Sequence, residues 1–395
     1  MDTNRAPGAF RSTQIRKNHD LAPVDNVDTL VIGAGQAGLS TAYHLTRRKQ
    51  SVLVLEALPR VGDVWRRRYD SLRLYSPSQY DGLPGWDMPM PKWSFPTKDE
   101  LADYLEQYAE RFELPVRTGV TVQRVERHEG VYVVQTDTGP IAADNIVVAT
   151  GTWQVPKVPE FAGRLDPGIT QLHSSQYRNL AQLQPGPALV VGAAHSGADL
   201  ALELSAAHPT TMAGPIRGQL PFDFAGAAAH AALPLLWFAG NRILTVKTPM
   251  GRKAREHVLH EGGPLLRVKR QHLEAAGVTI TEHKVTGVEG GRPVLADGQQ
   301  LDVRNVLWCT GFRHEMSWID LPLTIDGSTG LPAHDRGVTD QPGLYFVGLP
   351  FLSRFASTLV GGVGADADRI ATHIVRQPAR VNPIAAVDER APAVP

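Results

Sequence analysis

Residues 29–38 read TLVIGAGQAG, an apolar run that leads into three glycines with the spacing GxGxxG. Between a strand and a helix, this spacing is typical of the turn that binds a dinucleotide. Gly33 makes the tight turn, Gly35 lets the backbone approach a pyrophosphate, and Gly38 lets the helix pack closely on the strand. The stretch therefore predicts a nucleotide-binding α/β unit.

The residues that follow the turn complete this unit. The helix opens with Gln36 and Ala37, where free N–H groups and the helix dipole attract a phosphate. A second apolar strand at Val52 to Leu55 ends in Glu56, whose carboxylate is placed to accept hydrogen bonds from a ribose. Together they predict an adenine dinucleotide on the first turn.

A second strand, turn and helix of the same kind begins at Ala188. Its turn, residues 192–197, reads GAAHSG, so that an alanine replaces the middle glycine. The loop after the next strand offers Arg217, a guanidinium suited to a 2′-phosphate. We interpret this segment as a second nucleotide site, in which His195 either contacts the nicotinamide ribose or amide or is a solvated cap. The candidate contacts on the turn are Gly192, Ala194, His195, Ser196 and Gly197.

The two units predict an α/β fold with two Rossmann-like dinucleotide-binding domains, the second inserted in the first. Two apolar strands end in Thr150-Gly151 and Thr310-Gly311, which indicates two crossings between the same pair of domains. The first domain would comprise residues 27–155 and 300–377, and the second residues 156–299. The ends of the chain, residues 1–26 and 378–395, have the composition of disordered segments.

Composition excludes several classes of protein. Lysine and arginine together number 40, as do aspartate and glutamate, so no net charge favours nucleic acid. The only cysteine, Cys309, cannot form an internal disulfide or a thiolate zinc site, and the histidine spacings predict no metal. The most apolar segment, Ala225 to Val246, is interrupted by polar residues, so we expect a buried or pocket-lining helix and no membrane span. The first 26 residues lack a secretory signal, which favours the cytoplasm.

Several further stretches carry a family resemblance. They read VGDVW at 61–65, RYDSLRL at 68–74, FPTK at 95–98, ATG at 149–151, CTGF at 309–312 and GLYFVG at 343–348. In these stretches the chain resembles the class B flavin-dependent monooxygenases, with the YUCCA-type enzymes and related bacterial flavoprotein oxidoreductases as the nearest branch. The resemblance covers most of residues 27–377. It implies FAD on the first turn, NADPH or NADH on the second, and oxygenation of a small organic substrate by molecular oxygen through a C4a-(hydro)peroxyflavin.

The resemblance also implies further site residues. Gly62 and Trp65 would pack on the flavin side of the pyrophosphate, and Val122 would offer backbone groups to the adenine. Tyr75 stands where many N-oxygenating members carry asparagine, so its hydroxyl and that of Ser76 are candidate catalytic donors to flavin-bound oxygen. The family motifs at the two crossings and before the last helix add Ala149, Thr150, Gly151, Gly311 and Gly348.

Two alternatives to a monooxygenase remain open at this point. One is an NAD(P)H oxidase or reductase that passes electrons to oxygen or a quinone without oxygenating a substrate. The other is a flavin-binding protein whose second nucleotide site has decayed, as Ala194 suggests. The sequence identifies neither the substrate nor the oligomeric state, and a homodimer is compatible with it.

Overall fold

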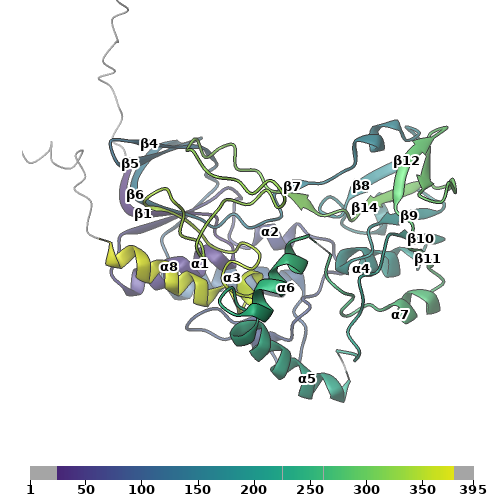
Figure 1. Ribbon diagram of the computed structural model, residues 1–395, viewed down its shortest axis with the longest axis horizontal. Coiled ribbons are helices and arrows are strands. Elements are labelled where there is room, and N and C mark those ends of the chain that lie inside the picture. The colour runs from purple at the N-terminus through teal and green to yellow at the C-terminus, as the bar shows by residue number, and fades with distance from the viewer. Residues whose placement is uncertain (1–24, 225, 261, 378–395) are drawn as a thin grey trace, which may run out of the picture.

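The computed structural model describes residues 25–224, 226–260 and 262–377 of the 395-residue chain. Two sheets lie side by side along the long axis of the molecule, with helices against their faces (Figure 1). The predicted disordered ends lie outside the described residues, except that Asp25 and Asn26 already belong to strand β1 (Asp25–Ile32).

The first sheet has seven strands in the order β3-β2-β1-β6-β5-β4, with β16 paired to β6. β1 lies in parallel between β2 and β6, and the last three strands of the series form an antiparallel meander. The strands are β2 (Val52–Glu56), β3 (Val116–Thr118), β4 (Val122–His128), β5 (Val131–Thr136), β6 (Gly139–Val148) and β16 (Leu344–Phe346).

Three helices pack against this sheet and against one another: α1 (Gln36–Arg47), α3 (Lys98–Arg111) and α8 (Gly364–Arg376). α3 begins at a capping box, in which the Thr97 side chain accepts from the backbone of Glu100 and the Glu100 carboxylate accepts from the backbone of Thr97. Its apolar face, with Leu101, Leu105 and Tyr108 fully buried, fixes the helix against α1 and the loop before it.

The second sheet has five parallel strands in the order β11-β10-β9-β14-β8. Its strands are β8 (Thr170–His173), β9 (Ala188–Val191), β10 (Thr210–Ala213), β11 (Thr279–Thr281) and β14 (Asn305–Trp308), and its helices are α4 (His195–Leu204) and α7 (Arg270–Ala275). The predicted boundary at residue 300 placed β14 with the first sheet, whereas β14 is hydrogen-bonded between β9 and β8. All four of its residues are buried, and a short apolar strand carries no signal for one parallel sheet over the other.

The two crossings between the sheets are adjacent. Strand β7 (Val155–Pro156) pairs in antiparallel with β15 (Phe312–Arg313), and the Lys157 amide donates to the carbonyl of Gly311 over 2.9 Å. The chain therefore leaves and re-enters the first sheet at one place, next to the ends of both central strands.

Several shorter elements connect the parts described so far. They are α2 (Asp63–Arg66), the hairpin β12 (Val285–Glu289) and β13 (Arg292–Leu295), and the short turns η1 (Ser78–Tyr80), η2 (Glu160–Arg164), η3 (Leu180–Gln182) and η5 (Phe355–Thr358).

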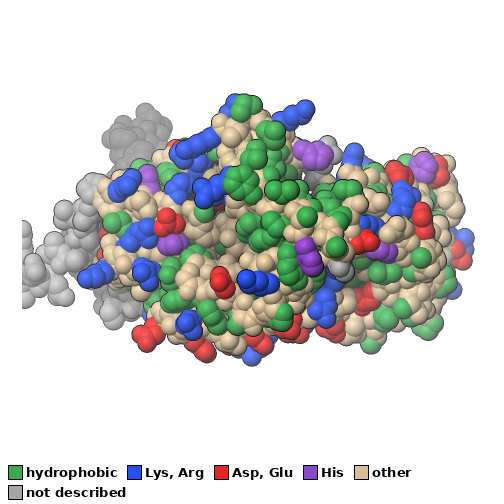
Figure 2. Space-filling view, turned by 90° about the horizontal axis from the view of Figure 1, so that it is seen from below, with side chains coloured by type: hydrophobic (Ala, Val, Ile, Leu, Met, Phe, Trp, Pro, Cys, Tyr) green, Lys and Arg blue, Asp and Glu red, His purple; other side chains and the backbone are tan. Residues whose placement is uncertain are grey.

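The apolar segment after β10, for which the sequence predicts a buried or pocket-lining helix, exposes several of its apolar side chains. It forms α5 (Ala227–Phe238) and the π-helical turn η4 (Ala239–Ile243), followed by α6 (Pro249–His260). Leu235 is 70% exposed and Phe238 58% exposed, and apolar side chains gather on this face of the molecule (Figure 2). No helix in the described ranges is long and apolar enough to cross a membrane.

Candidate functional site

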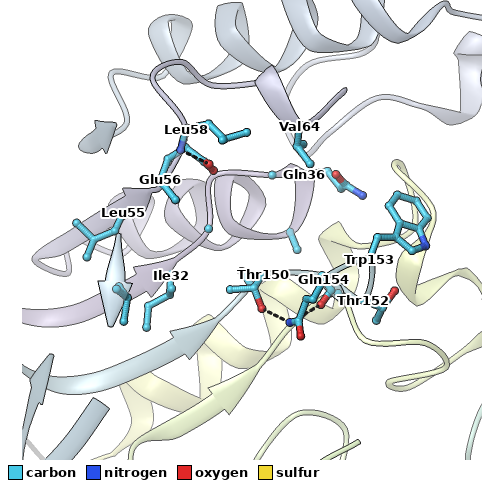
Figure 3. A pocket seen from close by; sticks show the side chains of 18 of the residues that line it. Ile32, Gln36, Leu55, Glu56, Leu58, Val64, Thr150, Thr152, Trp153 and Gln154 are labelled. Carbon is cyan, nitrogen blue, oxygen red and sulfur yellow. Dashed lines mark hydrogen bonds between the residues drawn. The ribbon is translucent and has the colours of Figure 1, made fainter. Parts of the chain in front are cut away.

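A cavity of about 640 Å³ follows the first glycine turn, a size typical of small-molecule and cofactor sites. It runs from Leu55 and Leu58 at one end, past the turn, to Trp153 at the other (Figure 3). Eleven of the predicted site residues line it: Gly33, Gly35, Gln36, Ala37, Glu56, Trp65, Val122, Ala149, Thr150, Gly151 and Gly348. The structure thus brings together segments that are far apart in the sequence.

The first glycine turn has the geometry that a phosphate needs. Gly33 has φ +103°, and a Cβ atom there would lie 2.8 Å from the carbonyl oxygen of Ala149. A Cβ at Gly38 would lie 1.8 Å from the carbonyl oxygen of Gly33, so helix and turn are in the close contact predicted. Gly35 differs, because no atom of the described residues lies within 4 Å of its Cβ position, and none of their side chains caps the helix that it begins. The turn therefore presents free N–H groups beside open space.

Glu56 is held rigidly at the end of β2. Its Oε2 accepts from the amide of Ala34 over 2.9 Å. Its Oε1 accepts from the amide of Leu58 over 3.0 Å (Figure 3). Each carboxylate oxygen keeps a further lone pair. The residue can therefore fix the turn and still accept a hydrogen bond from a ribose hydroxyl in the cavity.

Trp65 supplies a test of whether a phosphate-containing cofactor fits. It lies in α2, which follows Gly62, where φ is +85° and a Cβ would lie 2.5 Å from the carbonyl oxygen of Ala102. The side chain is only 7% exposed, and its Nε1–H has no acceptor among the described residues. A buried donor without a partner is costly, and a phosphate oxygen would satisfy it. FAD therefore fits this cavity.

The second glycine turn repeats the close packing of the first. Gly192 has φ +112°, and a Cβ there would lie 2.4 Å from the carbonyl oxygen of Cys309 at the end of β14. A Cβ at Gly197 would lie 1.8 Å from the carbonyl oxygen of Gly192. Ala194 is the N-cap of α4, which no side chain caps, and Arg217 is exposed in the loop after β10. The backbone of a nucleotide turn is thus kept despite the missing middle glycine.

His195 is not a solvated cap. Its ring lies 4.7 Å from the ring of Tyr75, and a Cβ at Gly263 would lie 2.8 Å from its Cε1, so the segment at Gly263 covers it. Its Nε2 is buried without a hydrogen-bond partner in the described part of the chain. Burial lowers the pKa of His195 below its usual value, and the imidazole is therefore neutral at pH 7.

The candidate donor Tyr75 faces the second sheet. Its hydroxyl donates over 3.4 Å to Oδ2 of Asp199 in α4, which also accepts from Tyr69 over 3.4 Å and from Arg267 over 3.2 Å. Burial raises the pKa of Asp199, and the guanidinium of Arg267 opposes that rise. This network joins the two units, and sequence reasoning missed it. The only signal was Asp199 itself, a carboxylate beside the apolar residues of a helix that also carries Glu203.

Ser76, the second candidate donor, bonds within the first unit. Its hydroxyl donates over 2.5 Å to Oδ1 of Asp81, whose side chain is fully buried. Burial raises the pKa of Asp81 to about 7, and Oδ2 has no partner among the described residues. Neither Ser76 nor Tyr75 is among the residues that line the cavity, and Asp81 was not foreseen from the sequence.

Two further features of the described residues concern metal binding and the thiol of Cys309. The described residues hold no group of three or more side chains that could bind a metal ion. Cys309 is a free cysteine, and burial raises the pKa of its thiol to about 12.

Two sheets that each place a glycine turn at a helix N-terminus define a two-nucleotide oxidoreductase, and comparison with known proteins agrees. Residues 30–214 match the pyridine nucleotide-disulphide oxidoreductase family. An uncharacterized CzcO-like oxidoreductase of Geobacillus kaustophilus is 38% identical over 350 residues, which cover 88% of this chain and 98% of that protein.

Monooxygenases are also among the similar proteins. A probable indole-3-pyruvate monooxygenase of Arabidopsis thaliana, YUCCA3, is 28% identical over 366 residues, or 84% of each chain. A flavin-containing monooxygenase from Stenotrophomonas maltophilia has a solved structure that superposes with a TM-score of 0.71 at 25% identity, over 89% of this chain and 99% of that one. The chain belongs to the class B flavin monooxygenase-like family of flavin-dependent oxidoreductases.

Proposed function

We propose that this protein is an FAD-containing, NADPH-dependent monooxygenase that oxygenates a small organic substrate. One observation supports it above the others: the cavity beside Gly35 combines uncapped helix N–H groups with the unpaired indole N–H of Trp65. Both are donors that a pyrophosphate would satisfy. We place the enzyme in the cytoplasm.

The two sheets suggest how the chain divides into domains. We propose that residues 25–156 and 312–377 hold FAD, and that residues 157–311 hold the nicotinamide nucleotide. This division follows the sheets and moves β14 into the second domain. The nucleotide would lie on the turn from Gly192 to Gly197, with Arg217 beside its 2′-phosphate.

In this proposal the side chains bind and orient, and the cofactor carries the redox chemistry. Bound FAD supplies electron transfer from NADPH and the activation of molecular oxygen. Glu56 holds the ribose, and the turn at Gly35 and the indole of Trp65 hold the pyrophosphate. The neutral His195 offers Nε2 to the nucleotide on the second turn. The tryptophans at 65 and 153, whose rings lie edge to face 5.8 Å apart, restrict water at one end of the cavity.

A second candidate function is supported by the cover over the second turn. A Cβ at Gly262 would lie 3.4 Å from the Cβ of Ala194, and Gly263 lies against His195. A chain segment in this place would compete with a nucleotide. A flavoprotein that no longer uses NADPH is therefore the alternative.

Anaerobic mixing of the purified protein with NADPH or NADH separates the two candidates. We expect the flavin absorbance to bleach with either nucleotide, whereas a decayed site would leave it unchanged. Oxygen is then added together with amines, sulfides, ketones or 2-oxo acids, and peroxide and products are measured. Transfer of oxygen to a substrate supports the monooxygenase. Peroxide equal to the NADPH consumed, with every compound, indicates an oxidase.

A further inference from the structure

Arg68 lies where the two crossings meet the cavity. Its side chain lines the cavity together with that of Trp65. Its guanidinium carbon lies 5.1 Å from the ring centroid of Trp153, which precedes β7, and 5.8 Å from that of Phe312, which begins β15. Trp153 marks the end of the cavity opposite Leu55 (Figure 3). Arg68 is thus held beside the second domain, away from the adenosine end.

The guanidinium of Arg68 has aromatic neighbours but no anion. In the part of the chain that the structure describes, it makes no hydrogen bond and no ion pair. Burial lowers its pKa, and the nearby Arg178 lowers it further. An arginine nevertheless stays charged, with five N–H donors to satisfy. A partly buried cation without an acceptor favours the arrival of an anion.

The cavity has no other cation to bind such an anion. Among the described lining residues, Arg68 is the single basic side chain, and the acids are Glu56 and Glu315. Glu56 is held by backbone amides at the far end, and Glu315 accepts from the amide of Ser317 over 2.8 Å. Neither is within ion-pair distance of Arg68. The charge of Arg68 is therefore available to a ligand.

We propose that Arg68 is an oxyanion-binding residue for the second ligand that enters the flavin cavity. The planar guanidinium matches two oxygens of one acidic group, which is either the carboxylate of the organic substrate or the pyrophosphate of NADPH. This inference rests on the proposed function, because it requires a second ligand beside FAD. It assigns the substrate class as an organic acid if the carboxylate is the group bound.

The test is a titration of the oxidised, flavin-loaded protein with three probes: NADP⁺, indole-3-acetate and the neutral indole-3-acetamide. Binding is followed by the flavin spectrum and by tryptophan fluorescence, since Arg68 lies over Trp153. The variants are Arg68→Gln, Arg68→Lys and the matched control Arg67→Gln, which removes the same charge from an exposed neighbour. We expect Arg68→Gln to weaken the binding of one of the two anions by about 10- to 100-fold. Arg68→Lys should weaken the binding of that anion less, and Arg67→Gln should change its affinity by less than about twofold.

The pattern of loss identifies the source of the oxyanion. Weaker binding of indole-3-acetate alone, with the amide unchanged, assigns a carboxylate substrate, and weaker binding of NADP⁺ alone assigns the nucleotide. The proposal is overturned if both anions bind Arg68→Gln as they bind the wild type, or if the wild type binds neither. If Arg68→Gln loses its flavin, Arg68→Lys is titrated in its place, and unchanged affinities overturn the proposal. Failure of NADPH to reduce the wild-type flavin would contradict the proposed function alone, because these titrations use oxidised protein.

Discussion

The rings of Tyr75 and His195 lie 4.7 Å apart, one from the loop after α2 and the other from the second glycine turn. Tyr75 also donates to Asp199 in α4, the helix that begins at His195. A residue of the first domain therefore supports the nucleotide turn of the second. This contact predicts that Tyr75 influences nucleotide binding.

We expect Tyr75→Ala to raise the KM for NADPH by about 2- to 10-fold, because an aromatic pair contributes roughly 0.5–1.5 kcal/mol. Tyr75→Phe keeps the ring and loses one long hydrogen bond, so its KM should stay within about twofold of the wild type. Steady-state kinetics with NADPH, at equal flavin content, checks both values. Equal KM values for all three proteins would show that the ring contact does not support the turn.

Arg267 should be needed to keep Asp199 in its buried place. Arg267→Ala leaves the carboxyl without its cation, and we expect a loss of about 3 kcal/mol in the free energy of unfolding. Burial already raises the pKa of Asp199, so the folded state binds the proton more tightly than the unfolded state. Its stability contribution is therefore present at acid pH and falls as the pH rises, more steeply in the variant.

Thermal unfolding at several pH values measures this effect. The double variant Arg267→Ala, Asp199→Asn should recover part of the stability and lose the added pH dependence. If Arg267→Ala and the wild type respond to pH in parallel, Asp199 does not depend on Arg267.

Asp81 should make the stability of the first domain depend on pH. Its pKa is about 7 in the folded protein, against an ordinary value of 3.8. Between these values the folded state holds the proton and the unfolded state does not, so stability falls as pH rises from about 4 to 7 and then levels off. The full loss is on the order of 4 kcal/mol. Asp81→Asn should flatten the profile over that range, whereas a profile parallel to that of the wild type would contradict the buried carboxyl.

Gly35→Leu should remove FAD from the protein. The Cβ position of Gly35 faces open space in the cavity. The variant would therefore fold without a clash, and its leucine side chain would occupy the phosphate site. We expect the ratio of flavin to protein in the purified variant to fall below about one tenth. Gly163→Leu is the matched control, because that glycine is exposed, has no atom within 4 Å of its Cβ position, and lies in η2. Full flavin occupancy in Gly35→Leu would exclude this turn as the FAD site.

Arg217 should distinguish NADPH from NADH. A guanidinium on a 2′-phosphate contributes about 1.5–3 kcal/mol when well formed, and an exposed one is at the lower end. Arg217→Ala should therefore raise the KM for NADPH by roughly tenfold and leave that for NADH unchanged. Arg292→Ala, which removes a similar charge from β13, serves as the control. Equal losses with both nucleotides would show that Arg217 does not bind the 2′-phosphate.

Local patterns were sufficient to predict the first unit from the sequence. The glycine turn at Gly33, the strand that ends in Glu56 and the helix that opens at Gln36 all depend on neighbours within a few residues, and all are present. Most residues expected at the FAD site also line one cavity.

Predictions that depended on distant contacts were less successful. β14 joins the second sheet because β8 and β9 leave a gap between them, which its own four residues do not reveal. The apolar composition of α5 predicted a buried or pocket-lining helix, yet Leu235 is 70% exposed. Tyr75 was expected to face the flavin, but its partner Asp199 is brought to it by a second domain. Arg68 could not be identified either, because its isolation from acids is visible only in three dimensions.

The raised pKa of Cys309 makes this chain suited to site-specific labelling. With a pKa of about 12, its thiol is almost entirely protonated at neutral pH, and the sequence contains no other cysteine. A cysteine introduced on an exposed position of each sheet would therefore be modified selectively by a maleimide dye. Two such dyes, one on each side of β7 and β15, would report the distance between the domains during turnover without any residue having to be removed first.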